Sequence, residues 1–319
     1  MFRDPNFPYL PKDFIETKQG LIFAVMSYQP EEGKVGCFLR YVFQDQTWQK
    51  VGTEQANTLL KQHYPHYLYH SKQADAHYHA VAIEEIVQHH QPEHRLQTVL
   101  QKETSDEIEL KLQQLIPILV QYGVDCTALG LTGSMLINRQ NAHSDIDLVV
   151  YGRNAFQQTR QAVQRAVDEG VLSLLDHDLM MDNFKRRLGE LSFEDFSWHE
   201  NRKYNKAVIK GCKFDIGMVC FANERQQDYN SHQKQGKQTM IAKVIDDRFA
   251  FDFPARYVVD NNELSEIVSF THTYVGQAKQ DEKIEVSGAV ERDMTTGKCR
   301  IVVGSSREAE GEYIKVLDK

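Results

Sequence analysis

The sequence contains no paired cysteine motif and no long apolar run. Its five cysteines are scattered along the chain without a Cys-x-x-Cys pair and make an odd total, which favours reduced thiols over a disulfide framework. No stretch approaches the ~18 consecutive apolar residues of a membrane-spanning helix, and the first residues lack the apolar core of a signal peptide. We therefore expect a cytoplasmic protein that has no membrane partner.

Positive charge is outnumbered by negative charge. The chain has 37 Lys and Arg against 45 Asp and Glu, a net charge of −8, which argues against wholesale coating of nucleic acid but allows a local basic groove. Hydrophobic residues make up 41% of the chain and aromatic residues 10%, which is enough for packed cores. Because 319 residues exceed one typical domain, we expect two or three domains.

Three regions differ in their residue patterns, and together they predict an α+β protein. Residues 1–97 are expected to form a small N-terminal accessory α/β module. Residues 98–225 alternate strands with amphipathic helices and contain the motifs described below. Residues 226–319 are polar until Phe249 and then carry several short strands, which predicts a β-rich C-terminal domain built as a barrel or a sandwich.

Local patterns predict the individual elements. Thr104 and Glu107 form a possible capping box at the start of a helix that continues to residue 122. Thr53 is expected to cap a shorter helix over 53–61. The other expected elements are a helix at 155–167 and strands at 20–26, 35–43, 128–132, 145–151, 213–219, 267–274, 284–292, 300–304 and 312–316.

An Asp-x-Asp motif is the strongest chemical signal. Over 145–151, the period-two alternation of a strand places Asp145 and Asp147 on one face and the apolar residues between them on the other. Like charges about 4 Å apart repel by roughly 4 kcal/mol at an effective dielectric of 20. A shared divalent cation removes that repulsion, and oxygen-only ligands suit Mg²⁺ better than zinc. An isolated Asp-x-Asp is also common at a solvated strand end, so the motif depends on its context.

A Gly-Ser turn upstream supplies that context. Gly133 and Ser134 follow the expected strand at 128–132 and precede Met135-Leu-Ile137, the expected start of a helix. Glycine lets the backbone approach a ligand closely, and the N-terminus of a helix presents unsatisfied N–H groups to an anion. The turn therefore favours phosphate binding beside the two carboxylates.

At this spacing the two motifs resemble the signature of the DNA polymerase β-like nucleotidyltransferase superfamily. That signature is a hydrophobic residue, Gly-Ser or Gly-Gly, a short spacer and then Asp-hydrophobic-Asp/Glu-hydrophobic. Thr132-Gly-Ser134 and Asp145-Ile-Asp-Leu148 fit it, apart from the threonine in the first position. The resemblance covers roughly residues 100–225 and implies the polymerase β-like core, a mixed sheet with helices.

The resemblance also implies a role for each matching residue. The family carries a third carboxylate on a later strand, and Asp215 is the best match. Asp145 and Asp147 would bind both ions of a two-metal site, and Asp215 would complete the metal that activates the attacking hydroxyl. Gly133 and Ser134 would hold the outer phosphates of a nucleoside triphosphate. The implied cofactors are two Mg²⁺ ions, for which Mn²⁺ can substitute, and the products are a nucleotidylated acceptor and pyrophosphate.

A cluster of basic residues precedes Asp215. Arg186, Arg187, Arg202 and Lys203 stand in an otherwise acidic chain, together with Lys185, Lys206, Lys210 and Lys213, and arginine can engage phosphates through two hydrogen bonds. We expect them to bind the nucleotide or the phosphates of the acceptor. A solvated helix and loop surface is the alternative interpretation.

The sequence leaves the acceptor open. Accessory regions on both sides of the motifs and the basic cluster favour an RNA end. One alternative is nucleotidylation of a protein side chain or of a small hydroxylated molecule such as an antibiotic. The other is a non-catalytic protein that binds RNA or senses nucleotides.

Overall fold

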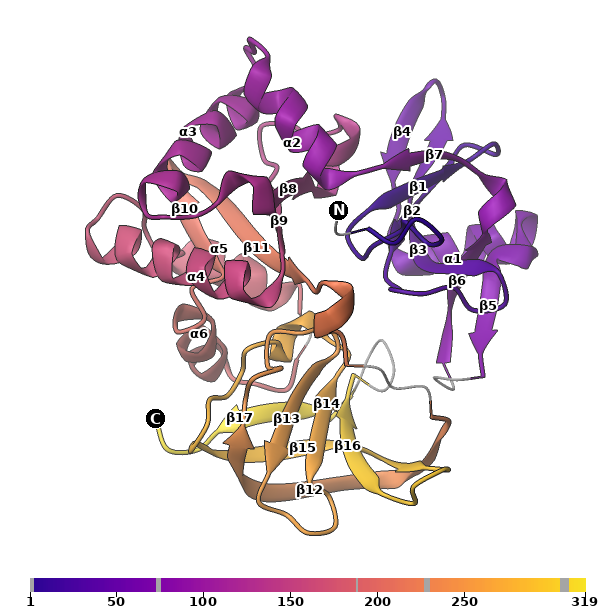
Figure 1. The fold of residues 1–319 in the computed structure, drawn as a ribbon, viewed down its shortest axis with the longest axis vertical. Helices are drawn as coiled ribbons and strands as arrows, with labels where there is room; N and C mark the ends of the chain where they lie inside the picture. Colours follow the sequence, from indigo (N-terminus) through magenta and orange to yellow (C-terminus); the bar gives the residue numbers. More distant parts are fainter. Residues whose placement is uncertain (1–2, 73–75, 188, 227–229, 305–309) are drawn as a thin grey trace. The chain divides into compact units, whose positions relative to one another are not determined.

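The computed structural model describes residues 3–72, 76–187, 189–226, 230–304 and 310–319. Within these ranges it contains three β-sheets and six α-helices (Figure 1), so the expected α+β class is confirmed. No helix in the described part is long and apolar enough to cross a membrane. The chain forms two compact units: the first comprises the described parts of Met1–Ser71, Ala76–Leu172 and Val208–Arg225, and the second those of Lys72–Asp75, Ser173–Ala207 and Gln226–Lys319.

The first unit begins with a seven-stranded sheet in the order β5-β6-β3-β2-β1-β7, with β4 paired to β3. The strands expected at 20–26 and 35–43 are confirmed as β2 and β3, which pair antiparallel. The elements are β1 (Phe14–Thr17), β2 (Leu21–Val25), β3 (Lys34–Gln44), β4 (Thr47–Lys50), α1 (Thr53–His63), β5 (Leu68–Ser71), β6 (Ala76–Ala82) and β7 (Ile86–His90).

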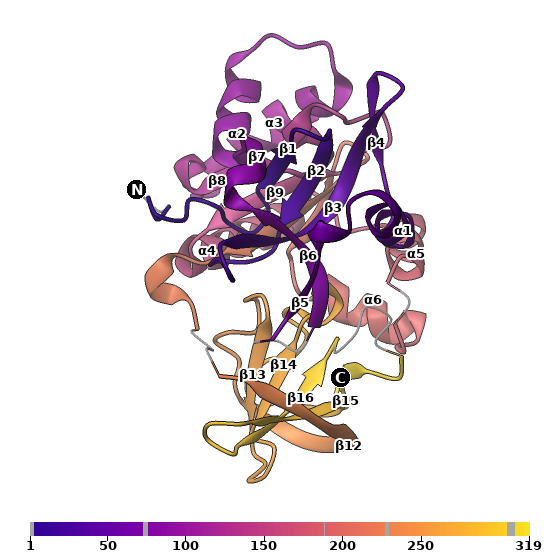
Figure 2. The same ribbon diagram turned by 90° about the vertical axis from the view of Figure 1, so that its right-hand side faces the viewer.

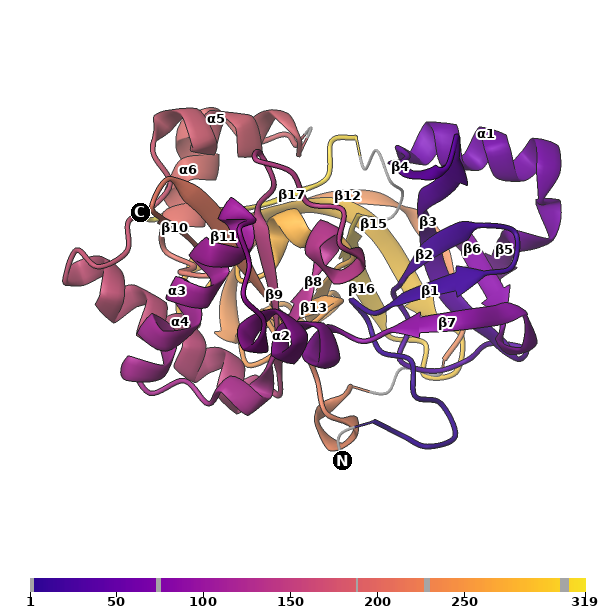
Figure 3. The same ribbon diagram turned by 90° about the horizontal axis from the view of Figure 1, so that it is seen from above.

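A four-stranded sheet in the order β10-β11-β9-β8 positions the predicted motifs. Its central strands β9 and β11 run parallel, and β8 pairs antiparallel with β9. Helix α4 packs on β9 and β11, and α2 packs on β8 (Figure 3). The elements are α2 (Pro92–Gln101), α3 (Glu107–Gln121), β8 (Leu129–Thr132), the 3₁₀ turn η4 (Gly133–Ile137), β9 (Ile146–Tyr151), α4 (Arg153–Asp168), β10 (Lys206–Ile209) and β11 (Cys212–Val219).

The N-terminal segment joins the two sheets of the first unit. Leu10 packs with Val149, Tyr151 and Val219 of the four-stranded sheet, and Leu136 of η4 packs in a cluster with side chains of β1, β2 and β3. Such shared apolar contacts are what makes two sheets fold as one body. The division of the chain into domains 1–97, 98–225 and 226–319 stays a prediction, and residues on both sides of position 97 share this unit.

The second unit is built on a closed ring of β-strand pairings. The strands pair in the order β12-β13-β14-β16-β15, β15 pairs back to β12, and β17 adds to β15 (Figures 1 and 2). The ring encloses an apolar core that also takes in side chains of α5 and α6. The elements are α5 (His177–Lys185), α6 (Phe193–Asn201), β12 (His232–Asp246), β13 (Ala255–Val259), β14 (Glu266–Ser269), β15 (Lys283–Asp293), β16 (Cys299–Val303) and β17 (Tyr313–Val316).

Several expected element boundaries are wrong. Gly52, not Thr53, is the N-cap of α1. Asp106 caps α3 through its own carboxylate, while Thr104 donates its hydroxyl to Glu109 instead of forming a capping box with Glu107. Aspartate accepts hydrogen bonds from the first helical N–H groups as readily as threonine does, so Asp106, which directly precedes the helix, is the N-cap.

Three expectations about strands and helices also fail. The polar region before Phe249, for which no strand was expected, contains the fifteen-residue strand β12. Its exposed polar first half pairs with β15, which in turn pairs with β16 and β17. The helix expected after Gly133 is the five-residue 3₁₀ turn η4, which ends at Asn138 in the left-handed conformation. The strand expected at 267–274 stops at Ser269 and is followed by the 3₁₀ turn η6 (His272–Tyr274).

Candidate active site

Two of the three predicted carboxylates are direct neighbours. Asp147 of β9 and Asp215 of β11 are register partners on parallel strands. Since the residues before and after each aspartate are buried apolar side chains, both carboxylates occupy the opposite face of the sheet. The Oδ1 atom of Asp215 is buried and has no hydrogen-bond partner among the described residues. A buried oxygen without a partner is costly, so this atom is suited to a ligand.

The pKa of Asp147 is affected by its burial and by the neighbouring carboxylates. The pKa of Asp147 is raised to about 6, mainly by burial and also by the charges of Asp215 and Asp145, while Lys12 and Lys213 act to lower it. A carboxylate with a raised pKa is one whose ionised form is disfavoured by its surroundings. A divalent cation placed between Asp147 and Asp215 would reverse that preference.

The third carboxylate has a different partner. Asp145 directly precedes β9, and its Oδ2 atom lies 2.8 Å from Nζ of Lys213. Among the described residues, no three His, Cys, Asp or Glu side chains are arranged closely enough to hold a metal ion. The structure thus brings Asp147 and Asp215 together and sets Asp145 against a lysine. The unpartnered oxygen of Asp215 and the all-oxygen donor set fit a hard cation such as Mg²⁺.

The predicted Gly-Ser turn lies directly against these carboxylates. Thr132, the residue before the turn, is the register partner of Asp147 on β8. Gly133 has φ +68°, and a Cβ at this position would lie 2.1 Å from Oδ2 of Asp147. Both the conformation and the space therefore require glycine here. The Ser134 hydroxyl lies 3.5 Å from that of Ser144, immediately before Asp145.

Two lysines complete the site: Lys213, a member of the predicted basic cluster, and Lys12, for which no role was predicted. Lys213 shares the face of Asp215, two residues along the same strand, so strand alternation could have identified it. Lys12 comes from the N-terminal segment: its carbonyl accepts a hydrogen bond of 2.6 Å from Thr132, and its Nζ lies 3.7 Å from where a Cβ on Gly217 would be. No local signal in the sequence indicates this long-range contact.

The residues Arg186, Arg187, Arg202 and Lys203 of the basic cluster belong to the second unit. Lys203 is buried, its ammonium 2.6 Å from Glu200 and 2.8 Å from the Thr273 carbonyl oxygen, and burial lowers its pKa to about 8. Arg202 stacks on the Trp198 ring at 4.4 Å and forms an ion pair with Glu282. Both side chains are thus engaged by partners within the second unit.

Arg186 and Arg187 follow directly after α5. The Arg186 side chain is 61% exposed and pairs with Asp182, and the backbone N–H of Arg187 donates to the Phe184 carbonyl. An exposed guanidinium with a carboxylate partner in solvent gains little from that pair. The side chain can therefore exchange partners, and a role of both arginines in binding phosphates stays a prediction.

Comparison with known proteins finds a relative along almost the whole chain. The "Uncharacterized protein MJ1086" of Methanocaldococcus jannaschii is 32% identical over 333 aligned residues, which cover 96% of this chain and 98% of that protein. No protein-family model matches the chain. No solved structure matches it either.

Proposed function

The chain belongs to the family of the uncharacterized protein MJ1086 of Methanocaldococcus jannaschii, and from its own residues we propose that it is a magnesium-dependent nucleotidyltransferase. It would transfer a nucleoside monophosphate from a nucleoside triphosphate to a hydroxyl acceptor and release pyrophosphate. The observation that carries the proposal is the pairing of Asp147 with Asp215 on parallel strands, with Gly133 held against the Asp147 carboxylate.

Each side chain of the site has a task in this reaction. Asp147 and Asp215 would hold magnesium, and Asp145 would join them by exchanging its contact with Lys213. Bound magnesium supplies positive charge to the phosphate oxygens during transfer. The acceptor oxygen bonds to the α-phosphorus as the bond to the pyrophosphate oxygen breaks, and Asp215 takes the hydroxyl proton. Ser134 and the N–H groups of η4 would hold the outer phosphates, with Lys12 and Lys213 offsetting their charge.

The acceptor is proposed to be an RNA end. Two features of the second unit support this choice. Closed five-stranded barrels occur in domains that bind oligonucleotides, and β12, β13, β14, β16 and β15 form such a ring. Arg186 is exposed next to α5 and can contact phosphates. Nucleotidylation of a protein side chain or of a small molecule is the alternative within the same chemistry.

Label transfer tests the proposal. The protein is incubated with Mg²⁺, each α-labelled nucleoside triphosphate and total cellular RNA or protein, and the labelled product is identified by digestion with ribonuclease or protease. We expect a ribonuclease-sensitive product, and we expect Asp215→Asn to lower turnover by at least the ~10²-fold typical of a lost general base. Asp178→Asn is the matched control, because this side chain on α5 is fully exposed.

The outcomes separate the alternatives. A protease-sensitive product would keep the chemistry and replace the RNA acceptor. Transfer of label at the wild-type rate by the Asp215→Asn protein would contradict the assignment of the carboxylates. Absence of label in any product, with a folded wild-type protein, would contradict nucleotidyl transfer itself.

A further inference from the structure

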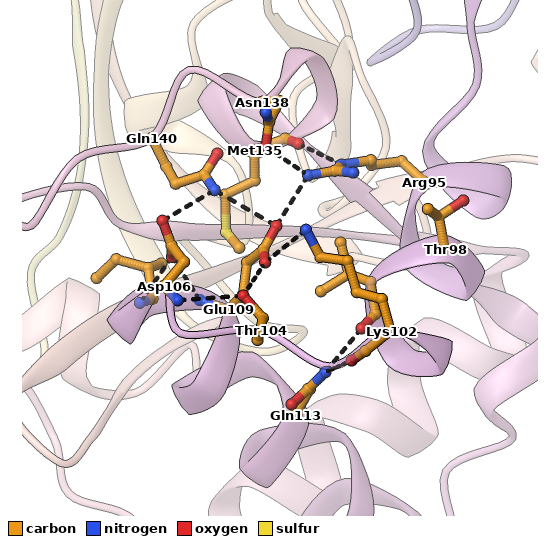
Figure 4. A network of polar contacts seen from close by, with 12 residues as sticks. Arg95, Thr98, Lys102, Thr104, Asp106, Glu109, Gln113, Met135, Asn138 and Gln140 are labelled. Atoms are coloured by element: carbon orange, nitrogen blue, oxygen red, sulfur yellow. Dashed lines mark hydrogen bonds and ion pairs between the residues drawn. The ribbon is translucent and has the colours of Figure 1, made fainter.

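A buried carboxylate outside the site organises a polar network around the Gly-Ser turn. Glu109, in the first turn of α3, is 1% exposed, and both of its oxygens are engaged (Figure 4). Oε1 lies 2.9 Å from Arg95. Oε2 accepts from Thr104 at 2.6 Å and pairs with Lys102 at 2.8 Å. A buried carboxylate that is fully paired in this way fixes the groups around it.

Arg95 of α2 connects this carboxylate to the turn. Its Nε donates to the Met135 carbonyl at 2.8 Å, and its Nη2 donates to Oδ1 of Asn138 at 3.1 Å as well as to Glu109 (Figure 4). Met135 lies inside η4, and Asn138 is the left-handed residue that ends it. One planar guanidinium thus binds the middle and the end of the turn that carries Ser134, which a lysine ammonium could not reproduce with the same geometry.

The cations beside Glu109 keep this buried carboxylate ionised. Burial acts to raise the pKa of Glu109, but the hydrogen bonds of Lys102 and Thr104 and the charges of Lys102 and Arg95 outweigh it, and the pKa is lowered. Glu109 is therefore ionised at neutral pH and holds Arg95 in place. Gln140, which follows the turn, donates to Asp106 and at 3.4 Å to the same Oε1 of Glu109.

We propose that Arg95 and Glu109 are positioning residues, which hold the Gly133–Ile137 turn in the geometry that receives the outer phosphates of a nucleoside triphosphate. This inference rests on the proposed function. Neither residue touches the phosphates: Arg95 acts through the Met135 carbonyl and Asn138, and Glu109 acts through Arg95. A turn that must present its N–H groups to an anion loses that ability when it is displaced by even about 1 Å.

Hydrogen exchange tests the positioning role without any ligand. Arg95→Lys keeps the charge but loses the simultaneous bonds to the turn, whereas Lys102→Met removes the other cation on Glu109 and leaves the turn's own contacts intact. We expect the amides of 133–139 to exchange at least about tenfold faster in Arg95→Lys than in the wild-type protein, and at the wild-type rate in Lys102→Met. Wild-type exchange of this segment in Arg95→Lys would overturn the inference.

Nucleotide binding tests what the turn is held for. Titration with ATP and with AMP, each with Mg²⁺, is expected to show about a tenfold loss of ATP affinity in Arg95→Lys, the effect of about 1.4 kcal/mol, with AMP affinity unchanged. Glu109→Gln should show a smaller loss of the same kind, and Lys102→Met none. Equal losses for ATP and AMP would mean a merely structural role and would overturn the inference. If the wild-type protein binds neither nucleotide, the proposed function fails, and the exchange experiment still decides whether Arg95 holds the turn.

Discussion

At the scale of single residues, Gly133 and Gly170 allow two effects of a substitution to be distinguished: backbone strain, and a steric clash with Asp147. Gly133 has φ +68° and Gly170 has φ +72°, so alanine at either position adopts a conformation that costs roughly 1–2 kcal/mol. A Cβ on Gly170 would meet nothing within 4 Å, whereas a Cβ on Gly133 would lie 2.1 Å from Oδ2 of Asp147. The two substitutions share the strain and differ in the contact.

We predict that Gly170→Ala lowers the free energy of unfolding by roughly 1–2 kcal/mol and leaves label transfer unchanged. Gly133→Ala should be less stable than Gly170→Ala and should transfer label about 10²-fold more slowly, because Asp147 or the turn must move by an amount that misplaces the reacting groups. Chemical denaturation and the transfer assay measure the two effects. Equal transfer rates in both variants would show that the close contact has no part in the reaction.

At the scale of elements, the helices and strands with a clear hydrophobic period could be predicted from the sequence. The apolar positions of α3, with Ile108, Leu112 and Leu119 among them, are buried as helical spacing requires. Strands β9 and β11 were predicted because their alternation continues over six and eight residues. Strand β12 was missed because the residues of its first half are polar and mostly exposed, so the sequence there has no hydrophobic period to detect.

Two buried histidines, one in each unit, are expected to make the protein sensitive to acid. His79 of β6 accepts a hydrogen bond from the Leu39 N–H through Nδ1 and donates through Nε2 to Asn57 of α1, so it is neutral, and burial lowers its pKa to about 4. In the second unit, burial likewise lowers the pKa of His199 to about 4. Each contributes stability that is complete above its ordinary pKa near 6.5 and is lost as the pH falls toward 4.

We therefore predict that stability declines between pH 6.5 and 4, with at most about 3 kcal/mol from each histidine. His79→Gln keeps one acceptor and one donor without a titrating group, so it should flatten the decline in the first unit. His199→Gln should do the same in the second. Chemical denaturation at pH 7.0, 5.5 and 4.5 measures the effect, with the half-exposed His66→Gln as the control. A decline in His79→Gln as steep as in the wild-type protein would contradict the assignment.

At the scale of the whole molecule, the contacts that complete the site join segments far apart in the sequence. The Asp-x-Asp and Gly-Ser motifs could be predicted because their residues lie within one strand–turn–strand segment. Lys12 reaches the same site from the N-terminal coil, and Arg95 reaches η4 from α2. Such contacts arise from the packing of whole elements. Proximity in the sequence also did not indicate which basic side chains are accessible, since the Lys203 ammonium is bound by Glu200 and the Thr273 carbonyl.

The burial of Lys203 and the pairing of Arg202 limit the expected salt dependence of RNA binding. Arg186 and Arg187 are the residues of the basic cluster that we still expect to contact RNA. Each phosphate contact on a single strand adds roughly −0.7 to the slope of the logarithm of the binding constant against the logarithm of the salt concentration, so two contacts add about −1.4.

We predict that the Arg186→Ala/Arg187→Ala protein binds a single-stranded RNA with a slope shallower by that amount and binds ATP as the wild-type protein does. Arg160→Ala, on a partly exposed side chain of α4, is the control and should keep the wild-type slope. Binding is measured by fluorescence anisotropy from low to moderate salt. If the wild-type slope is flat, the acceptor is not RNA, and the small-molecule or protein acceptor takes its place with the transfer chemistry unchanged. A steep slope that the double variant retains would instead place the RNA-binding surface elsewhere on the molecule.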